Sequence, residues 1–246
     1  MTNIKKNQIG FIFDLDGTLI NTTEIGKIIE KEILLYFNIE LDKKLKEKID
    51  NHVFEILQQE NRKRLGRKIL VAIFKILGLS FKQRIKALTI SSRVFKEEIQ
   101  KIKLYDGVKE LFEFLDDNDY SYAIATTSSS KEVDDRLKRF PDFYHKFTNR
   151  IVSRSDVKNL KPHSESIEKA ANLMGSISLS KCVMVGDMDN DINLGKGVGA
   201  ITIGVLTGIF SKEMLHKLKP DFIIDSVAQI PNIIENIKEK FKETPN

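Results

Sequence analysis

Two aspartates stand directly after a short apolar segment near the start of the sequence. Residues 9–13 lead into Asp14 and Asp16, and a glycine, Gly17, follows. Two carboxylates this close repel each other, and an apolar approach withdraws them from water, so a bound cation is a natural partner. No Cys or His stands beside them, and hard oxygen ligands of this kind favour Mg²⁺ over zinc. The ordinary alternative is a strand-to-turn junction in which Asp and Gly are turn residues.

A second apolar segment, residues 182–185, also ends in acidic residues. Asp187, Asp189 and Asp191 follow it after Gly186. If a short helix begins after this glycine, Asp187 and Asp191 are one helical turn apart. An EF-hand-like calcium loop is a competing interpretation, but its glycine and final Glu are not at the required positions. A chance acidic turn is the other. The preferred interpretation is a second set of metal-binding carboxylates.

Two further signals concern phosphate. Thr126 and Thr127 open a run of hydroxyl side chains between a strand-like segment and a helix. Hydroxyls and free amides at a helix N-terminus bind phosphate, although Ser and Thr also serve simply as N-caps. Lys161 precedes a proline that limits its backbone, so it can direct a positive charge at an anion. Many such lysines are only solvated surface residues.

The elements that must position these residues alternate between strands and helices. Six short apolar runs predict strands at residues 9–13, 120–125, 150–153, 182–185, 200–205 and 222–224. Helical spacing of apolar residues predicts helices at residues 108–115, 164–174 and 230–241. This alternation predicts an α/β fold with a doubly wound parallel sheet, whose ligands bind beyond the carboxyl ends of the strands.

A long connection separates the first two predicted strands. From residue 24 to residue 101 apolar residues such as Ile25, Ile28 and Ile29 recur at helical spacing. A structureless loop of this length is improbable, so we expect an inserted all-helical cap domain at 21–102 above the ligand-binding edge. The α/β core then comprises 1–20 and 103–246. At the join, Asp106 is expected to cap the next helix.

Taken in order, the four signals are strand-DxDGT, strand-Thr, Lys-Pro and strand-GDxxxD. This combination resembles the haloacid dehalogenase superfamily, in particular its phosphatase branch with a helical cap, similar to phosphoglycolate phosphatases. The matching residues span Asp14 to Asp191, and residues 104–111 and 220–225 match too. The resemblance therefore covers nearly the whole chain, with the cap the least diagnostic part. It is specific for the superfamily and says little about the substrate.

The resemblance implies a catalytic role for three residues. Asp14 would be the nucleophile that takes the phosphoryl group, and Asp16 would protonate the leaving oxygen and then deprotonate the hydrolytic water. Lys161 would contact both the phosphate and Asp14. Thr126 would hold a phosphate oxygen, helped by backbone amides around Thr127; strand register favours Thr126 over Thr127 as the hydroxyl used.

The resemblance also implies a Mg²⁺ site. Its ligands would be the Asp14 side chain, the Asp16 backbone carbonyl and Asp187, with Asp191 orienting bound waters or Lys161. Asp189 stands where relatives commonly have a small residue, and it is a further candidate for the metal shell. Dehalogenases of the superfamily lack an aspartate two residues after the nucleophile, so Asp16 favours phosphoryl chemistry.

These implications predict a Mg²⁺-dependent phosphatase that hydrolyses a small organic phosphomonoester, such as a phosphoglycolate-like or sugar phosphate, through a phospho-aspartate. A phosphomutase and a pyrophosphatase of the same fold remain open, as does Schiff-base chemistry on a cap lysine. A non-catalytic module that binds a polyanion is the alternative from another class. Residues 61–96 hold eleven Lys or Arg and no Asp or Glu, which also suits a solvated helix face. From this stretch Arg62, Lys63, Arg64, Arg67 and Lys68 are candidates to meet a substrate carboxylate or second phosphate.

The composition fits a soluble globular protein, with 41% hydrophobic and 30% charged residues. A single cysteine allows no internal disulfide. The longest apolar stretch, residues 69–79, is too short for a membrane span, and the first apolar run is too short for a signal peptide. A cytoplasmic location and a small phosphorylated metabolite as partner are therefore expected. No glycine-rich or aromatic-interleaved nucleic-acid signature accompanies the basic stretch, and monomer and homodimer remain open.

Overall fold

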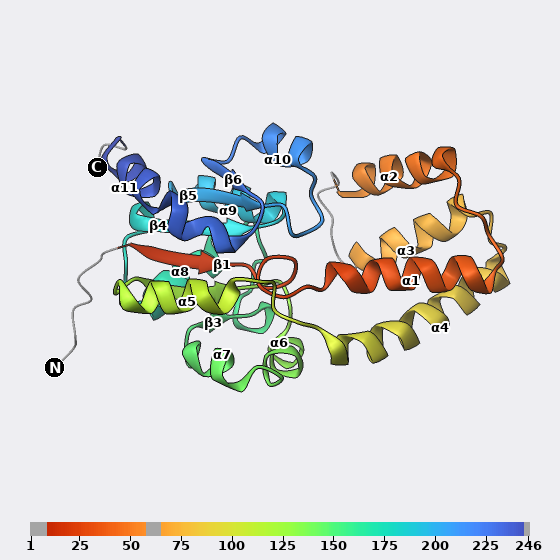
Figure 1. The fold of residues 1–246 in the computed structure, drawn as a ribbon, viewed down its shortest axis with the longest axis horizontal. Coiled ribbons are helices and arrows are strands. Elements are labelled where there is room, and N and C mark those ends of the chain that lie inside the picture. Colours follow the sequence, from red (N-terminus) through yellow and green to blue (C-terminus); the bar gives the residue numbers. More distant parts are fainter. Residues whose placement is uncertain (1–8, 58–64, 244–246) are drawn as a thin grey trace. The chain divides into compact units, whose positions relative to one another are not determined.

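The computed structural model describes residues 9–57 and 65–243 (Figure 1). The chain divides into two compact units. The core unit comprises Met1–Thr23 and Ile102–Asn246, and the helical unit comprises Glu24–Lys101. The ranges predicted for the core and the cap differ from these units by three residues at the first join and one at the second.

The core unit contains a parallel sheet of six strands in the order β3-β2-β1-β4-β5-β6. The strands are β1 (Gly10–Phe13), β2 (Ser121–Ala125), β3 (Ile151–Val152), β4 (Cys182–Gly186), β5 (Ile201–Val205) and β6 (Phe222–Ile224). The chain runs outward from β1 to β3 and then returns to β4 on the other side of β1. Because this reversal defines a doubly wound sheet, the predicted fold class is confirmed.

Burial explains why the strands read as continuous apolar runs. Every residue of β1, β2, β4 and β5 is buried. A strand covered on both faces has no solvent side to mark with polar residues, so the alternation of a half-exposed strand is absent. Strand β3 is shorter than the predicted 150–153, and it pairs only with β2 at the edge of the sheet.

Helices cover both faces of this sheet (Figure 1). They are α5 (Val108–Asp117), α6 (Ser130–Leu137), α7 (Pro141–Lys146), α8 (Glu165–Leu173), α9 (Asp189–Gly197), α10 (Lys212–Leu218) and α11 (Ile234–Glu243), with short 3-10 helices η2 (Arg154–Asp156), η3 (Leu179–Lys181) and η4 (Val227–Ile233). Helix α8 shares an apolar cluster with Ile12 and Met184. The ring of Phe112 in α5 lies 5.1 Å from that of Phe13 and 4.9 Å from that of Tyr122. Neighbouring strand residues point to opposite faces, so Ile12 and Phe13 mark the two layers of core.

One local prediction is wrong, and one predicted helix starts later than expected. Asp106 does not cap α5: the cap residue is Gly107, in the left-handed conformation and without a side-chain cap bond. A Cβ on Gly107 would lie 2.4 Å from that of Ala228, so close packing as well as backbone conformation requires glycine there. The helix predicted over 230–241 begins instead within the 3-10 segment η4, which contains Pro231, and becomes α-helical only at Ile234. Proline has no amide hydrogen for the α-helical bond, which accounts for this start.

The helical unit is built from α1 (Thr23–Tyr36), α2 (Lys43–Leu57), α3 (Leu65–Ile76), α4 (Phe81–Glu98) and the 3-10 turn η1 (Ile99–Lys101). Within its described residues the unit contains no strand. A capping box formed by Ser80 and Gln83 starts α4. The buried apolar side chains of α1, at Ile25, Ile29 and Ile33, follow the spacing of one helix face.

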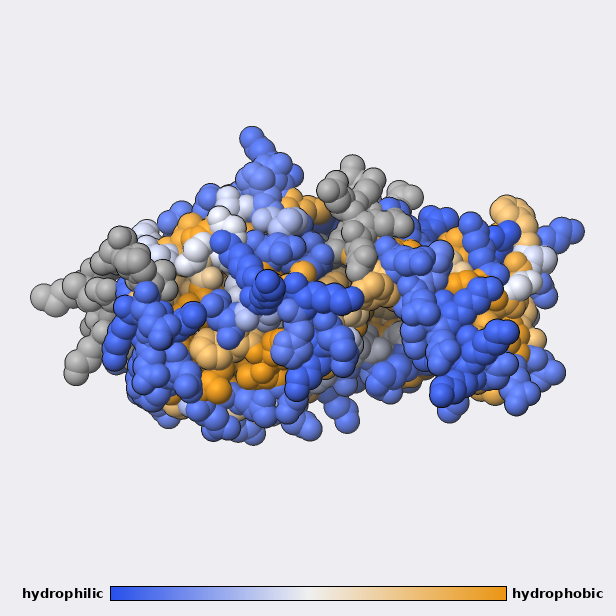
Figure 2. Space-filling model, turned by 90° about the horizontal axis from the view of Figure 1, so that it is seen from above, coloured by the Kyte–Doolittle hydropathy of each residue, from blue (hydrophilic) through white to orange (hydrophobic). Residues whose placement is uncertain are grey.

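The surface of both units is mainly hydrophilic on the face shown in Figure 2, with smaller apolar patches between the charged residues. In the helical unit the large apolar side chains that remain exposed include Leu35, Tyr36, Phe81 and Ile85. Across the described part of the chain, none of the helices has the length and apolar character needed to cross a bilayer.

Candidate active site

Three predicted aspartates meet at the carboxyl ends of the two central strands. Strands β1 and β4 pair in parallel with Phe13 opposite Val185, and the amide of Asp14 donates to the carbonyl of Val185 at 2.8 Å. Asp14, Asp187 and Asp191 are all buried, and one carboxylate oxygen of each lies within 4.8 Å of the others. Parallel pairing therefore brings together residues that are far apart in the sequence.

Lys161 completes this cluster. Its Nζ donates to Asp14 Oδ1 at 2.8 Å and to Asp191 Oδ1 at 2.7 Å. The lysine side chain is 2% exposed, so these two bonds form away from water. The predicted lysine thus contacts two of the acidic residues directly.

The cluster holds three carboxyl groups and one ammonium group away from water. Burial and mutual repulsion shift the pKa values of these groups. Burial raises the pKa of Asp14 to about 7, Lys161 opposes this rise, and the neighbouring Asp191 adds to it. Burial, together with the charges of Asp14 and Asp191, also raises the pKa of Asp187 well above its usual range. Burial alone would lower the pKa of Lys161, but the two carboxylates outweigh it and raise that pKa above its ordinary value. When all three carboxyl groups are ionised, they and the one ammonium group carry a net negative charge, which a divalent cation would neutralise.

Backbone packing holds Asp187 in place. Its Oδ2 accepts a hydrogen bond from the amide of Ile209 at 2.8 Å. A Cβ on Gly208 would lie 1.8 Å from that oxygen, and one on Gly17, whose φ is +83°, would lie 2.8 Å from it. The loop after β5 therefore encloses the carboxylate, which the sequence did not predict. The donor set of fixed, hard oxygen atoms fits a divalent metal ion.

The arrangement of the acidic residues after β4 differs from the prediction in one detail. Helix α9 begins at Asp189, so Asp187 precedes the helix, and the prediction that Asp187 and Asp191 are one helical turn apart is wrong. The extended backbone of Met188 separates the strand from the helix. Asp189 is half-buried and is not a member of the three-aspartate cluster.

Asp16 has a different set of partners from the other site aspartates. Its Oδ2 accepts a hydrogen bond from Ser128 Oγ at 2.8 Å and one from Arg136 Nη1. Arg136 Nη1 also donates to Ser128 Oγ at 2.7 Å. The other carboxylate oxygen of Asp16 is buried and has no hydrogen-bond partner among the described residues. The sequence predicted Asp16 but neither of its partners; the only signal was an arginine on the same helix face as the apolar Val133 and Leu137.

Thr126 and Thr127 lie in the loop between β2 and α6. Thr126 is buried and its Oγ1 accepts a hydrogen bond from the amide of Ser128 at 3.1 Å, whereas Thr127 is exposed. Helix α6 starts only at Ser130, with Ser129 as its cap. Because Ile124 of β2 lies opposite Phe13 of β1, Thr126 belongs to the same edge of the sheet as Asp14.

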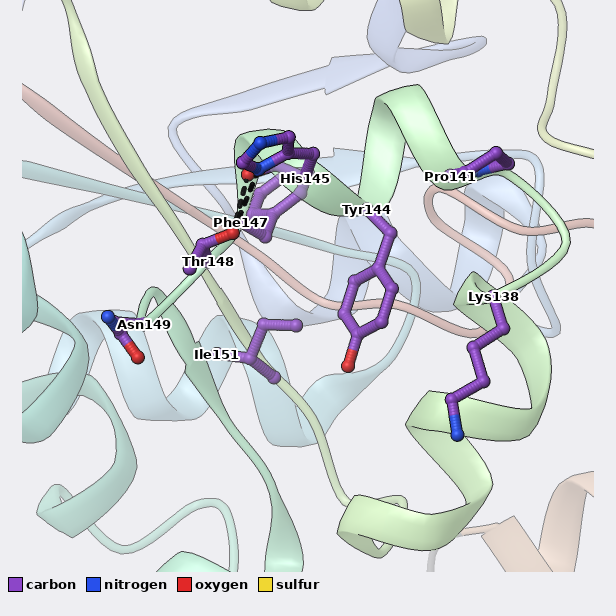
Figure 3. Close-up of a pocket in the computed structure, with 8 residues that line it drawn as sticks. All are labelled: Lys138, Pro141, Tyr144, His145, Phe147, Thr148, Asn149 and Ile151. Atoms are coloured by element: carbon purple, nitrogen blue, oxygen red, sulfur yellow. Dashed lines mark hydrogen bonds between the residues drawn. The ribbon is translucent and has the colours of Figure 1, made fainter.

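Two cavities are lined by side chains other than these site residues. A cavity of about 690 Å³ in the core unit contains none of the predicted site residues (Figure 3). It is lined by Lys138, Pro141, Tyr144, His145, Phe147, Thr148, Asn149 and Ile151. A second, of about 510 Å³, belongs to the helical unit and is lined by His52, Arg67, Lys68, Val71, Ala72, Lys75 and Ile76. Among the predicted specificity candidates, Arg62, Lys63 and Arg64 lie outside the described residues.

Comparison with known proteins gives the site its context. A family model described as "Haloacid dehalogenase-like hydrolase" matches residues 11–205. Pyrophosphatase PpaX of Halalkalibacterium halodurans is 30% identical over 230 residues, which cover 91% of this chain and 95% of the relative. Pyrophosphatase PpaX of Listeria monocytogenes is 29% identical, with 92% and 95% covered.

Solved structures show the same fold. A predicted phosphoglycolate phosphatase from Haemophilus somnus has a TM-score of 0.69 and 22% identity, with 93% of this chain and 99% of the other covered. A hydrolase from Pseudomonas syringae has a TM-score of 0.63 and 23% identity, with the same coverage. The chain therefore belongs to the haloacid dehalogenase-like hydrolase family, and its predicted class, a phosphatase-type hydrolase, is confirmed at the level of that family.

Proposed function

We propose that this chain is a Mg²⁺-dependent phosphatase that hydrolyses a small phosphomonoester through a phospho-aspartate on Asp14. The observation that carries the proposal is the contact of Lys161 Nζ with both Asp14 and Asp191, inside a buried cluster of three carboxylates. A buried nucleophilic carboxylate must approach an anionic phosphate, and a fixed cation offsets the repulsion between them.

Asp14, Asp187 and the backbone carbonyl of Asp16 would hold the metal ion. When bound, Mg²⁺ would neutralise the clustered carboxylates and the charge on the transferred phosphoryl group. Asp191 is the carboxylate that Lys161 already contacts at 2.7 Å, so its proposed role is to orient this lysine. Lys161 in turn fixes one oxygen of Asp14 and leaves the other for attack on phosphorus.

The phosphoryl group would be held at the carboxyl end of β2. Thr126 would donate its hydroxyl to one phosphate oxygen, and the amides of the loop around Thr127 would bind the others. Asp16 would protonate the leaving oxygen and then take a proton from the water that hydrolyses the phospho-aspartate. Splitting the displacement into two steps lowers the barrier of each.

A second candidate substrate is inorganic pyrophosphate. It is favoured by the relatives named pyrophosphatase, which align with more than nine-tenths of this chain. A phosphomutase of the same fold would need the phospho-aspartate to outlast its attack by water and to be regenerated from a bisphosphate. A non-catalytic polyanion-binding module is the least favoured, because every residue type that the chemistry needs is in place.

Three further parts of the account are predictions from the sequence. The inserted helical domain, predicted at 21–102, would act as a cap that excludes water and supplies specificity contacts. The partner would be a small phosphorylated metabolite, and the protein would act in the cytoplasm.

The proposal is tested by measuring phosphate release from p-nitrophenyl phosphate and a panel of small phosphomonoesters. The assay is run with Mg²⁺, with a chelator and with the Asp14→Asn variant. Turnover that requires Mg²⁺ and is lost in Asp14→Asn supports the proposal. A folded protein that binds Mg²⁺ and hydrolyses no phosphate compound contradicts it.

A further inference from the structure

A buried arginine stands beside the proposed acid-base residue. Arg136 belongs to α6, and only 8% of the residue is exposed. Its Nη1 donates to Asp16 Oδ2 and to Ser128 Oγ, and Ser128 Oγ donates to the same oxygen of Asp16. Arginine stays charged in proteins, so this places a permanent cation on the carboxylate.

The guanidinium has more N–H donors than its bonds to Asp16 and Ser128 use. It carries five N–H groups in a planar fork, and within the described part of the chain its recorded hydrogen bonds all leave from Nη1. Glu132 lies one turn earlier in α6, where the charge of Arg136 acts on its carboxylate. That carboxylate accepts hydrogen bonds from the amide and the hydroxyl of Ser129. The N–H groups on Nε and Nη2 are thus candidates to donate to an anionic group that enters the site.

We propose that Arg136 binds the charge of the leaving group and so directs the site toward phosphoanhydrides, of which inorganic pyrophosphate is the smallest. This inference rests on the proposed function, in which Asp16 contacts the leaving oxygen. A second phosphoryl group bonded to that oxygen would lie one bond beyond the Asp16 contact, next to the guanidinium that holds Asp16.

The electrostatics favour this assignment. An alkoxide leaving group carries no second charge, and Asp16 alone suffices to protonate it. A phosphate leaving group is far less basic than an alkoxide and can depart without a proton from Asp16. It is a multiply charged anion, and the ionised carboxylate of Asp16 would repel it. A guanidinium fixed on that carboxylate cancels the repulsion and offers the fork geometry that suits phosphate oxygens.

The reaction balances in two steps. An Asp14 oxygen bonds to one phosphorus, the bond from that phosphorus to the bridging oxygen breaks, and the electron pair leaves on the bridging oxygen as orthophosphate beside Arg136. Water then attacks the phosphorus of phospho-Asp14, its proton passes through Asp16 to solvent, and Asp14 is released with a second orthophosphate. One pyrophosphate and one water give two orthophosphates.

The test compares kcat/KM for pyrophosphate with kcat/KM for glycerol phosphate in Arg136→Met, in the presence of Mg²⁺. Losing a charge-assisted contact to the leaving group should lower the ratio of the two values by about 10- to 100-fold. Arg136→Lys should give a smaller fall, because lysine keeps the charge and loses the fork. Ser128→Ala removes the uncharged partner of Asp16 and should leave the ratio unchanged.

A matched control removes a cation from another carboxylate of the core unit. Lys146 pairs with Asp116 on the surface, and Lys146→Met should change neither rate. If Arg136→Met does not fold, the inhibition of glycerol phosphate hydrolysis by imidodiphosphate is compared between wild type and Arg136→Lys. The inhibition constant should rise about 10-fold or more in the variant.

Several results would overturn the inference. An equal fall for both substrates in Arg136→Met would mean that the arginine only positions Asp16. A wild type that hydrolyses phosphomonoesters but not pyrophosphate would refute the inference and leave the proposed function standing. A wild type with no Mg²⁺-dependent hydrolysis of either would remove the proposed function and the inference with it.

Discussion

In the metal-free protein, Asp14→Asn should become more stable relative to wild type as the pH rises. Burial raises the pKa of Asp14 from 3.8 to about 7 in the folded protein. The folded state therefore keeps a proton on this carboxyl over a pH range in which the unfolded chain has lost it. The contribution of Asp14 to stability is fully present below about pH 4 and is lost as the pH rises through about 7.

The magnitude follows from proton linkage. One pKa unit corresponds to about 1.4 kcal/mol, and two of the shifted units lie between pH 5 and pH 7, so wild type should lose about 3 kcal/mol through this group between pH 5 and pH 8. Asparagine does not ionise and still offers an oxygen to Lys161. The free energy of unfolding of Asp14→Asn minus that of wild type should therefore rise by about 3 kcal/mol over this range.

The assay is urea unfolding of both proteins at several pH values, in EDTA. Taking the difference between the proteins cancels the titration of all groups that the substitution leaves alone. Adding Mg²⁺ at pH 8 should shrink or reverse the difference, because wild type gains the free energy of metal binding. A difference that stays flat or falls with rising pH in EDTA would refute the idea that these carboxylates are crowded and need a cation.

Other substitutions probe the remaining parts of the site. Gly208→Ala should lower Mg²⁺-dependent turnover by about 100-fold or more, because its Cβ would lie 1.8 Å from Asp187 Oδ2. Gly197→Ala, whose Cβ would meet nothing within 4 Å, is the control. Near-normal turnover in Gly208→Ala would contradict the enclosure of Asp187. Thr126→Ala should lower kcat/KM for a phosphomonoester by about 10-fold or more, as measured by steady-state kinetics. Substitution of the exposed Thr127 by Ala should lower it by less than about 3-fold. The reverse order would show that Thr127, and not Thr126, holds the phosphate. Lys161→Met should lower the free energy of unfolding of the metal-free protein at pH 8 by about 3 kcal/mol, since it leaves buried carboxylates without their partner; no loss in urea unfolding would argue against the bridging lysine.

The residues that end central strands were the most predictable from the sequence. Apolar segments before Asp14 and Asp187 predict adjacent buried strands, and parallel pairing then brings the two carboxylates to one edge. Lys161 was named by its motif, although 147 positions separate it from Asp14. The fold class followed from the same alternation of strands and helices.

The parts that were missed depend on contacts that no local pattern encodes. Arg136 lies 120 positions from Asp16, and its neighbours in α6 give an ordinary helix with one charged residue on the buried face. Gly208 and Ile209 enclose Asp187 only because β5 neighbours β4 in the sheet. The wrong cap at Asp106 came from treating a turn by residue type alone, whereas packing against Ala228 makes Gly107 the cap residue.

The central claim is that Asp14 carries the phosphoryl group during turnover, and it can be observed directly. The wild-type protein is mixed with Mg²⁺ and a substrate that the phosphate-release panel has identified, quenched in acid during the first turnovers, digested and analysed by peptide mass spectrometry. The account predicts a phosphoryl group on the peptide that contains Asp14, located on that residue by borohydride reduction of the acyl phosphate, and none in Asp14→Asn. Steady turnover with no phosphoryl group on Asp14 at any quench time would contradict it.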